Sequence, residues 1–139
     1  MSHPTFEHLL FNVCDHVATV TLNRPDVRNA LNARAYAEIE SAFRFIQEEP
    51  DIRVVVITGT DPAFCSGEDV KQMMTGPNRE QSQRRLSTVR PRLTPTAAAI
   101  YECDRPVIAA VNGTAVGWGM ELSLLADIRI ASDLSLIHI

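Results

Sequence analysis

The chain has 139 residues, of which 45% are hydrophobic and 22% are charged, and it carries a formal net charge of −4 at pH 7. A chain of this length and composition can bury a hydrophobic core, so wholesale disorder is excluded and one domain is expected. Proteins that bind nucleic acids usually carry a basic balance, so the negative charge argues against a nucleic-acid partner.

The cysteines and the short apolar runs argue against a metal site, a disulfide framework and a membrane anchor. Cys14, Cys65 and Cys103 lie far apart without a CxxC pair of the kind that binds zinc, and their odd number does not fit a secreted disulfide framework. The amino terminus lacks the pattern of a signal peptide, and apolar runs such as residues 54–57 are far shorter than the ~20 residues of a membrane span. We therefore expect no metal, no membrane contact and a cytoplasmic protein, or one of an organelle matrix if the source is eukaryotic.

The amino-terminal segments predict two strands joined by a tight turn. Residues 8–13 and 17–23 are rich in Val, Thr, Leu and Phe, and Asp15 and His16 stand between them as a turn signal. Pro25 ends the second strand, because proline has no backbone N–H for the strand ladder and fixes φ.

A long amphipathic helix follows this strand pair. Asn32 is a favoured N-cap residue for a helix that continues to about residue 49, and Pro50 stops it. Its apolar residues recur at helical spacing and form one stripe: Ala35, Ile39, Ala42, Phe43 and Ile46.

The middle of the chain combines a strand with polar connections. The β-branched run at residues 53–58 predicts a strand buried on both faces, followed by a loop over residues 59–62. Residues 69–74 predict a short helix, with Asp69 near its start, where a carboxylate suits the helix dipole. The stretch at residues 75–92 is polar and rich in arginine, and a charge run of this kind is expected to face water.

Helices and strands continue to alternate in the second half of the chain. We expect a helix over residues 94–103, a buried strand over 107–112, a glycine-bearing loop over 113–117, a helix over 118–125 and a strand over 127–131. This alternation predicts an α/β fold with largely parallel strands.

Two loops share one layout, in which a buried strand runs out into a glycine-bearing loop and a helix begins just beyond it. They span residues 63–70 and 112–122. Ligands bind at the carboxyl ends of strands in α/β sheets, and helix starts offer unpaired backbone N–H groups. Two such loops side by side could aim two donors at one oxygen, which is the physical description of an oxyanion hole.

Four segments in this order resemble the crotonase (enoyl-CoA hydratase/isomerase) family, and the resemblance extends from about residue 17 to residue 132. The two loops read Ala63-Phe64-Cys65-Ser66-Gly67-Glu68-Asp69-Val70 and Asn112-Gly113-Thr114-Ala115-Val116-Gly117-Trp118-Gly119-Met120-Glu121-Leu122. The other segments are Leu22-Asn23-Arg24-Pro25 with Asn29-Ala30-Leu31-Asn32, and Ala126-Asp127-Ile128-Arg129-Ile130-Ala131. The resemblance implies a crotonase-like (ClpP/crotonase) spiral of strand–helix repeats, truncated, with residues 1–133 as the amino-terminal part of the core domain. Residues 134–139 depart from the family pattern, and we interpret them as an atypical tail that is foreign or frame-shifted.

The resemblance also implies a specific chemistry. Family members bind acyl-CoA thioesters and stabilise an enolate-like oxyanion with two backbone N–H groups, which belong to Glu68 and Trp118 here. Water addition to a 2-enoyl thioester pushes charge onto the carbonyl oxygen, so such donors stabilise the transition state more than the ground state. Glu121 matches the first of two catalytic glutamates of the hydratases and could hold water or move a proton. Without the family pattern, Glu121 would be interpreted as a solvated residue of the first helical turn.

An enoyl-CoA hydratase acting in fatty acid metabolism is the leading function on this resemblance. The alternatives are an enoyl-CoA isomerase, another crotonase chemistry such as thioester hydrolysis or decarboxylation, and an inactive fragment, because the second glutamate is expected past residue 139. No cofactor is implied, since coenzyme A is part of the substrate. The full-length parent is expected to be a homotrimer or hexamer.

Other positions match family contacts to the CoA and acyl groups: Arg28, Ala30, Ser66, Gly67, Asp69, Val70 and Gly117. Lys71 either approaches a phosphate or is an exposed helix charge.

Three residues need a separate interpretation. Trp118 interrupts a glycine triplet, where its ring narrows the acyl pocket, stacks on a substrate group or packs as a core aromatic. Glu68 replaces a small apolar residue, and because a carboxylate beside an oxyanion is unfavourable, we expect it to point away or to pair with a base. Cys65 has no histidine pattern in support of a nucleophile, so a small buried thiol is preferred.

Overall fold

The computed structural model describes residues 4–75 and 93–138 of the chain. The arginine-rich stretch predicted at residues 75–92 lies outside these ranges, except for Thr75, which ends a helix. Within the described ranges, no helix combines the length and the apolar character needed to cross a membrane.

A five-stranded sheet forms the base of the fold, in the order β1-β2-β3-β5-β7. Its strands are β1 (Leu9–Cys14), β2 (Val17–Leu22), β3 (Val54–Gly59), β5 (Val107–Val111) and β7 (Ile128–Ala131). The first pair is antiparallel, and all the later pairs are parallel, as the alternation of strands and helices predicted. Asp15 and His16 join β1 to β2 with φ values of 48° and 67°, the left-handed geometry that suits a two-residue hairpin turn.

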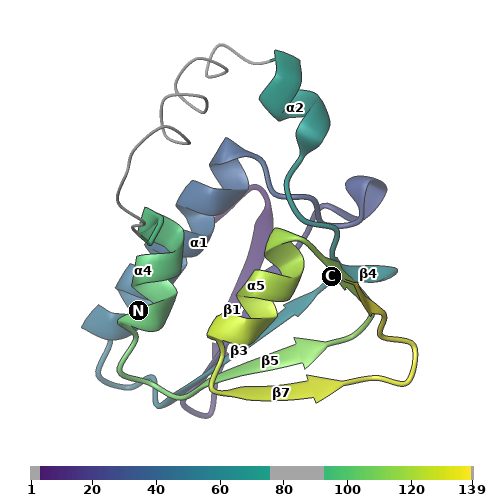
Figure 1. The fold of residues 1–139 in the computed structure, drawn as a ribbon. Helices are drawn as coiled ribbons and strands as arrows, with labels where there is room; N and C mark the ends of the chain where they lie inside the picture. The colour runs from purple at the N-terminus through teal and green to yellow at the C-terminus, as the bar shows by residue number, and fades with distance from the viewer. Residues whose placement is uncertain (1–3, 76–92, 139) are drawn as a thin grey trace.

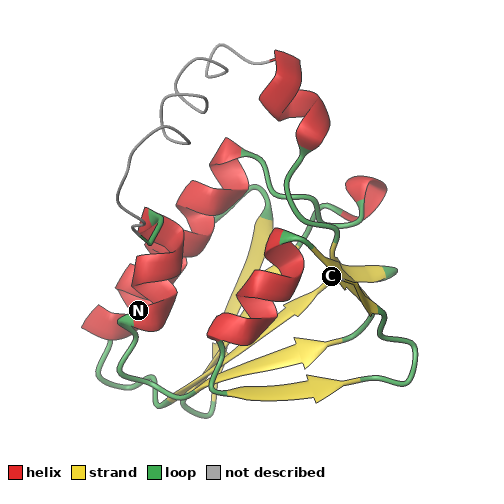
Figure 2. Cartoon of the chain, viewed as in Figure 1, coloured by secondary structure: helices red, strands yellow, loops and turns green. Residues whose placement is uncertain are grey.

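Three helices lie together over this sheet: α1 (Ala33–Glu48), α4 (Pro95–Tyr101) and α5 (Trp118–Leu125). Figure 2 shows them grouped in front of the strands. The Asn32 side chain caps α1 by accepting a hydrogen bond of 2.8 Å from the Ala35 N–H, and the predicted apolar stripe of α1 is buried. Side chains from all three helices and from the sheet form one core cluster.

The expectation that the third strand is buried on both faces is wrong. Along β3, buried residues alternate with half-buried ones, and Val55 and Ile57 point into the core. Val54 and Val56 lie on the opposite face of the sheet, which the described residues cover only in part. A run of β-branched residues therefore does not show here whether a strand is buried on both faces of the sheet or on one face only.

A second, smaller sheet was not predicted. It contains β4 (Ala63–Cys65), β6 (Thr114–Val116) and β8 (Ile137–His138), in the order β4-β6-β8 with parallel pairing. The first two of these strands lie within segments that we expected to be loops. Strands of two or three residues are too short to give a periodic hydrophobic pattern, and only pairing with distant segments reveals them.

The short elements of the fold lie around the first loop. A 3-10 helix, η1 (Pro25–Val27), follows β2, and α2 (Val70–Thr75) begins directly after Asp69. Asp69 lies at the start of this helix, as predicted, and its side chain caps the helix by accepting a hydrogen bond of 3.2 Å from the Gln72 N–H. Figure 1 shows α2 standing apart from the group of helices that covers the sheet.

Candidate active site

The first loop leaves the backbone N–H of Glu68 free to serve a ligand. Leu31 forms a parallel bridge with Glu68, in which the Leu31 N–H donates to the Gly67 carbonyl (2.8 Å) and the Leu31 carbonyl accepts from the Asp69 N–H (2.9 Å). These bonds use the groups on either side of Glu68, so the N–H of Glu68 points away from Leu31. It donates none of the hydrogen bonds found among the described residues.

The second loop provides a matching donor at the start of α5. Gly117 precedes the helix with φ 53° and ψ −122°, and its carbonyl accepts from the N–H groups of Met120 (3.0 Å) and Glu121 (3.1 Å). Trp118 is the first helical residue, so its N–H has no acceptor within the helix. A side chain on Gly117 would meet open space, and the positive φ is therefore what requires glycine at this position.

The backbones of the two loops are in direct contact. β4 and β6 pair directly, with Ala63 opposite Thr114. A Cβ atom added to Gly67 would lie 2.7 Å from the Val116 carbonyl oxygen and 3.5 Å from the Trp118 nitrogen. A Cβ atom on Gly119 would lie 2.2 Å from the Cys65 carbonyl oxygen. Because no side chain separates the loops, the donors of Glu68 and Trp118 are held as neighbours.

A cavity of about 390 Å³ opens where the loops meet. Its lining consists of Ser66, Gly67, Glu68, Val70, Gly117, Trp118 and Glu121. All seven were singled out from the sequence as catalytic or substrate-binding residues. Glu121 lies in the first turn of α5, one turn beyond the Trp118 donor, so a carboxylate and two backbone donors share one cavity. This combination can bind an anionic oxygen and hold or move a proton next to it.

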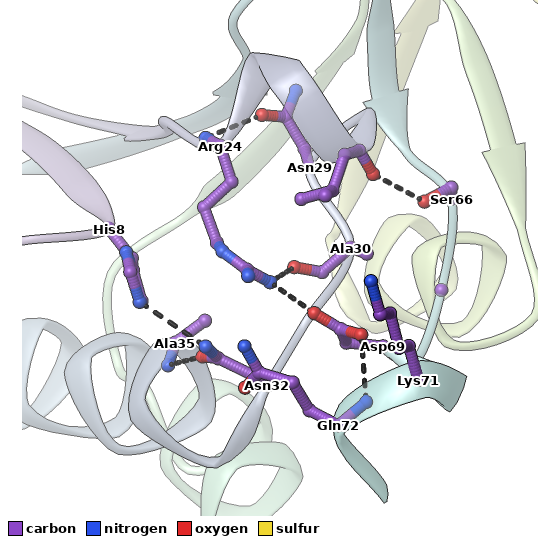
Figure 3. A network of polar contacts seen from close by, with 12 residues as sticks. His8, Arg24, Asn29, Ala30, Asn32, Ala35, Ser66, Asp69, Lys71 and Gln72 are labelled. Atoms are coloured by element: carbon purple, nitrogen blue, oxygen red, sulfur yellow. Dashed lines mark hydrogen bonds and ion pairs between the residues drawn. The ribbon is translucent and has the colours of Figure 1, made fainter. Parts of the chain in front are cut away.

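The remaining predicted residues, Arg28, Ala30 and Asp69, do not line this cavity but hold its first loop in place. The guanidinium of Arg24 donates to the Ala30 carbonyl and pairs with Asp69 at 3.0 Å. Only 12% of the Arg24 side chain and 10% of the Asp69 side chain are exposed. The Arg28 carbonyl accepts a hydrogen bond of 3.0 Å from the Ser66 N–H. Figure 3 shows Arg24 between Ala30 and Asp69, joining the segment before α1 to the first loop.

Arg24 is a positioning residue that the sequence did not assign a role. Its guanidinium binds Ala30 and Asp69, which adjoin the Leu31–Glu68 bridge, so it links the two bridged segments. The only signal in the sequence was its place in the Leu22-Asn23-Arg24-Pro25 segment. Its partner Asp69 is 45 residues away and could not be inferred from spacing.

Comparison with known proteins assigns this arrangement to a family. A family model described as enoyl-CoA hydratase/isomerase matches residues 13–138. The chain belongs to the enoyl-CoA hydratase/isomerase family. The family, the fold and the amino-terminal placement predicted from the four segments are thereby confirmed.

Individual relatives agree with this assignment. The chain is 39% identical over 131 residues to the probable enoyl-CoA hydratase EchA14 of Mycobacterium tuberculosis, covering 94% of this chain and 49% of that protein. It is 39% identical over 132 residues to the (E)-benzylidenesuccinyl-CoA hydratase of Thauera aromatica, covering 86% of this chain and 45% of that protein. A crystal structure of an enoyl-CoA hydratase from Mycobacterium smegmatis superimposes with a TM-score of 0.85 at 33% identity, over 96% of this chain and 51% of that one. The chain therefore spans about half the length of the relatives that it matches.

Both residues that depart from the family's usual pattern, Glu68 and Trp118, line the cavity. The Trp118 ring packs edge-on against Tyr36, with ring centroids 5.0 Å apart at 88°, and the residue also lines the cavity. Trp118 therefore lines the cavity and also packs against a residue of α1, so it is not only a core aromatic. Glu68 makes no ion pair with a base among the described residues. Burial and then the charge of Glu68 raise the pKa of the Tyr36 hydroxyl far above its usual range, although this hydroxyl has no hydrogen-bond partner among the described residues.

Cys65 remains a structural thiol in this family site. Burial raises its pKa to about 11, although the Gly67 N–H donates to its sulfur at 3.4 Å and opposes that shift. The thiol is therefore protonated at neutral pH and is not a nucleophile. In the part of the chain that the structure describes, no group of three or more His, Cys, Asp or Glu residues could hold a metal ion. Lys71 is exposed, and its contact with a phosphate stays a prediction.

Proposed function

We propose that this chain forms the thioester-binding part of an enoyl-CoA hydratase, with Glu68 and Trp118 as its oxyanion hole. The observation that carries the proposal is the pair of free backbone N–H groups on two interlocked loops, at a cavity that Glu121 also lines. The relatives named as CoA-thioester hydratases support the same reaction class.

The geometry supports the following division of labour. The thioester carbonyl oxygen accepts hydrogen bonds from the Glu68 and Trp118 N–H groups, while Glu121 holds the water that adds to the double bond. As water adds, charge moves onto the carbonyl oxygen, and fixed donors stabilise it without reorganisation. Removing one donor of this kind typically costs about 10²–10³ in rate. The reaction uses groups of the protein and of the substrate, so we infer no cofactor.

The CoA portion of the substrate would lie along the first loop. Arg28, Ala30 and Ser66 are candidates for its contacts, together with Lys71. We infer a role in fatty acid metabolism in the cytoplasm, and a homotrimeric or hexameric full-length protein, from the family resemblance. The second glutamate of a hydratase is expected beyond residue 139, and an enoyl-CoA isomerase is the second candidate if a different residue stands there.

The test is hydration of crotonyl-CoA by the natural full-length protein, followed as loss of the absorbance of the conjugated thioester. Glu121→Gln should lower kcat by at least about 10², the range of general acid–base catalysis, with a small change in KM. Glu48→Gln is the matched control, because Glu48 is an exposed glutamate at the end of α1. Conversion of a 3-enoyl-CoA to its 2-enoyl isomer without hydration would favour the isomerase. Equal activity of wild type and Glu121→Gln would overturn the assigned role of Glu121.

A further inference from the structure

Asn29 is a buried polar residue between η1 and α1, and the proposed function leaves it without a role. Only 1% of the residue is exposed. Its φ of 57° lies in the left-handed region, which asparagine adopts more readily than most other residues. Buried amides are nearly always hydrogen-bonded, and the partners of this one lie in two different segments of the chain.

Both ends of the Asn29 amide are used. Its oxygen accepts a hydrogen bond of 2.9 Å from the Arg24 N–H, which Figure 3 shows. Its nitrogen donates to the carbonyl oxygens of Thr60 (2.7 Å) and Ala63 (2.8 Å). Because a carbonyl oxygen can only accept, these two partners determine which end of the amide carries the nitrogen. Asn29 therefore joins the segment before α1 to the turn between β3 and β4.

This turn leads directly into the first loop. Ala63 is the first residue of β4, and β4 ends at Cys65, three residues before Glu68. Gly59 allows the close approach of the Asn29 amide, because a Cβ atom at position 59 would lie 2.8 Å from the amide nitrogen. The turn is thus packed tightly against the Asn29 side chain.

The same turn also contacts the start of the second loop. The Asn112 side chain accepts a hydrogen bond of 3.2 Å from the Gly59 N–H and donates one of 3.1 Å to the Asp61 carboxylate. A Cβ atom on Gly113 would lie 2.9 Å from the Pro62 carbonyl oxygen. A shift of this turn would therefore change how the first loop lies against the second.

The neighbours of Asn29 contact the first loop further along the chain. The Arg28 carbonyl accepts from the Ser66 N–H, and Leu31 is bridged to Glu68. Arg28 and Leu31 make these contacts with backbone groups, whereas Asn29 makes its contacts with a side chain. The contribution of Asn29 can therefore be removed by a substitution.

We propose that Asn29 is a positioning residue of the oxyanion hole, whose amide sets the path of the turn before β4 and so keeps the Glu68 N–H in place beside the Trp118 N–H. This inference rests on the proposed oxyanion role of those two groups. A misplacement of about 1 Å at a reacting centre can cost on the order of 10² in rate, so small shifts of the first loop should be measurable.

Two substitutions in the natural full-length protein test the proposal. Asn29→Asp keeps the shape of the side chain and the oxygen that accepts from Arg24, but it replaces the donating nitrogen with an oxygen that repels both carbonyls. Asn29→Gly removes the amide and keeps a residue that adopts the left-handed φ without strain. Asn12→Asp is the matched control, because Asn12 is exposed on β1.

In crotonyl-CoA hydration, both Asn29 variants should lower kcat per folded molecule by at least about tenfold, with a much smaller change in KM. Asn12→Asp should change neither constant. Circular dichroism at the assay temperature gives the folded fraction, and Asn29→Gly decides the result if Asn29→Asp does not fold. A purely structural role would lower Tm and leave kcat per folded molecule unchanged. That result, or an Asn29→Gly variant that does not fold, would overturn the proposal.

A binding readout separates this proposal from the hydratase activity. Acetoacetyl-CoA carries a thioester that forms an enolate, whereas coenzyme A has no thioester carbonyl. In calorimetry, Asn29→Gly should weaken acetoacetyl-CoA binding by about tenfold and leave coenzyme A binding unchanged. If wild type binds acetoacetyl-CoA but hydrates nothing, the hydratase assignment fails and the binding comparison still decides the role of Asn29. Equal losses for both ligands would overturn that role, and wild-type binding of acetoacetyl-CoA no tighter than that of coenzyme A would overturn both proposals.

Discussion

Replacing Arg24 with methionine should destabilise the protein far more than replacing an exposed arginine. The Arg24–Asp69 pair is almost completely buried, with side-chain exposures of 12% and 10%. Removing one partner of a buried ion pair typically costs about 3–5 kcal/mol, because it leaves the other charge unpaired. The Ala30 carbonyl loses its donor in the same variant.

Arg44→Met is the matched control for this substitution. Arg44 pairs with Glu40 on the surface of α1 at 2.8 Å, with exposures of 60% and 27%. Exposed pairs of this spacing contribute about 0.3–0.5 kcal/mol. Urea denaturation of the natural protein would give the free energy of unfolding of both variants.

A second substitution shows whether the cost of Arg24→Met comes from the unpaired charge. Asp69→Asn keeps an oxygen to cap α2 but removes the charge that Arg24 neutralises. The double variant Arg24→Met/Asp69→Asn should therefore be more stable than the sum of the two single changes predicts. Additive losses, or an Arg24→Met effect no larger than that of Arg44→Met, would refute the view that this pair fixes the first loop.

Three further outcomes follow from the site and its surroundings. Gly117→Ala should lower kcat by about 10², which is the cost of losing one oxyanion donor. The reason is that alanine strains the backbone at the φ of 53° that directs the Trp118 N–H. Steady-state kinetics that show this loss with an unchanged KM would support the prediction. Iodoacetamide at pH 8 should label the exposed Cys14 in native protein and should not label Cys65, because burial raises the pKa of Cys65 to about 11. Mass spectrometry of tryptic peptides would measure the labelling of each cysteine. Burial alone would raise the pKa of Glu38, but hydrogen bonds from the Glu7 and His8 N–H groups and from Arg34 lower it on balance. Its stabilising contribution is therefore present above the unfolded pKa of about 4.3 and is lost as pH falls below that value, so Glu38→Gln should flatten the acid limb of stability against pH.

Local signals predicted the elements whose structure depends on neighbouring residues. The Asp15–His16 turn, the Asn32 cap and the start of α5 at Trp118 all agree with the structure, because each depends on a few adjacent side chains or on a glycine. The stripe of α1 was also predictable, since one face of a helix repeats every three to four residues.

Features that depend on distant pairing could not be predicted. β4 and β6 exist because two three-residue segments pair with each other across the chain, and neither has a pattern of its own. The Arg24–Asp69 pair and the contact between Tyr36 and Trp118 likewise join segments far apart in the sequence. The predicted cavity residues all lie in the motif segments. Arg24 and Asp69 lie in such segments too, but nothing in the sequence indicated that they pair with each other.

The identity of the donors explains how this site accommodates Glu68 and Trp118. Both proposed oxyanion donors are backbone groups, so their direction depends on the path of the chain and not on the side chain that each residue carries. The strict requirements fall on neighbouring positions: Gly67 and Gly119 let the loops touch, and Gly117 allows the turn before α5. Substitutions at these glycines should therefore cost more activity than side-chain changes at position 68 that leave the path of the backbone unchanged.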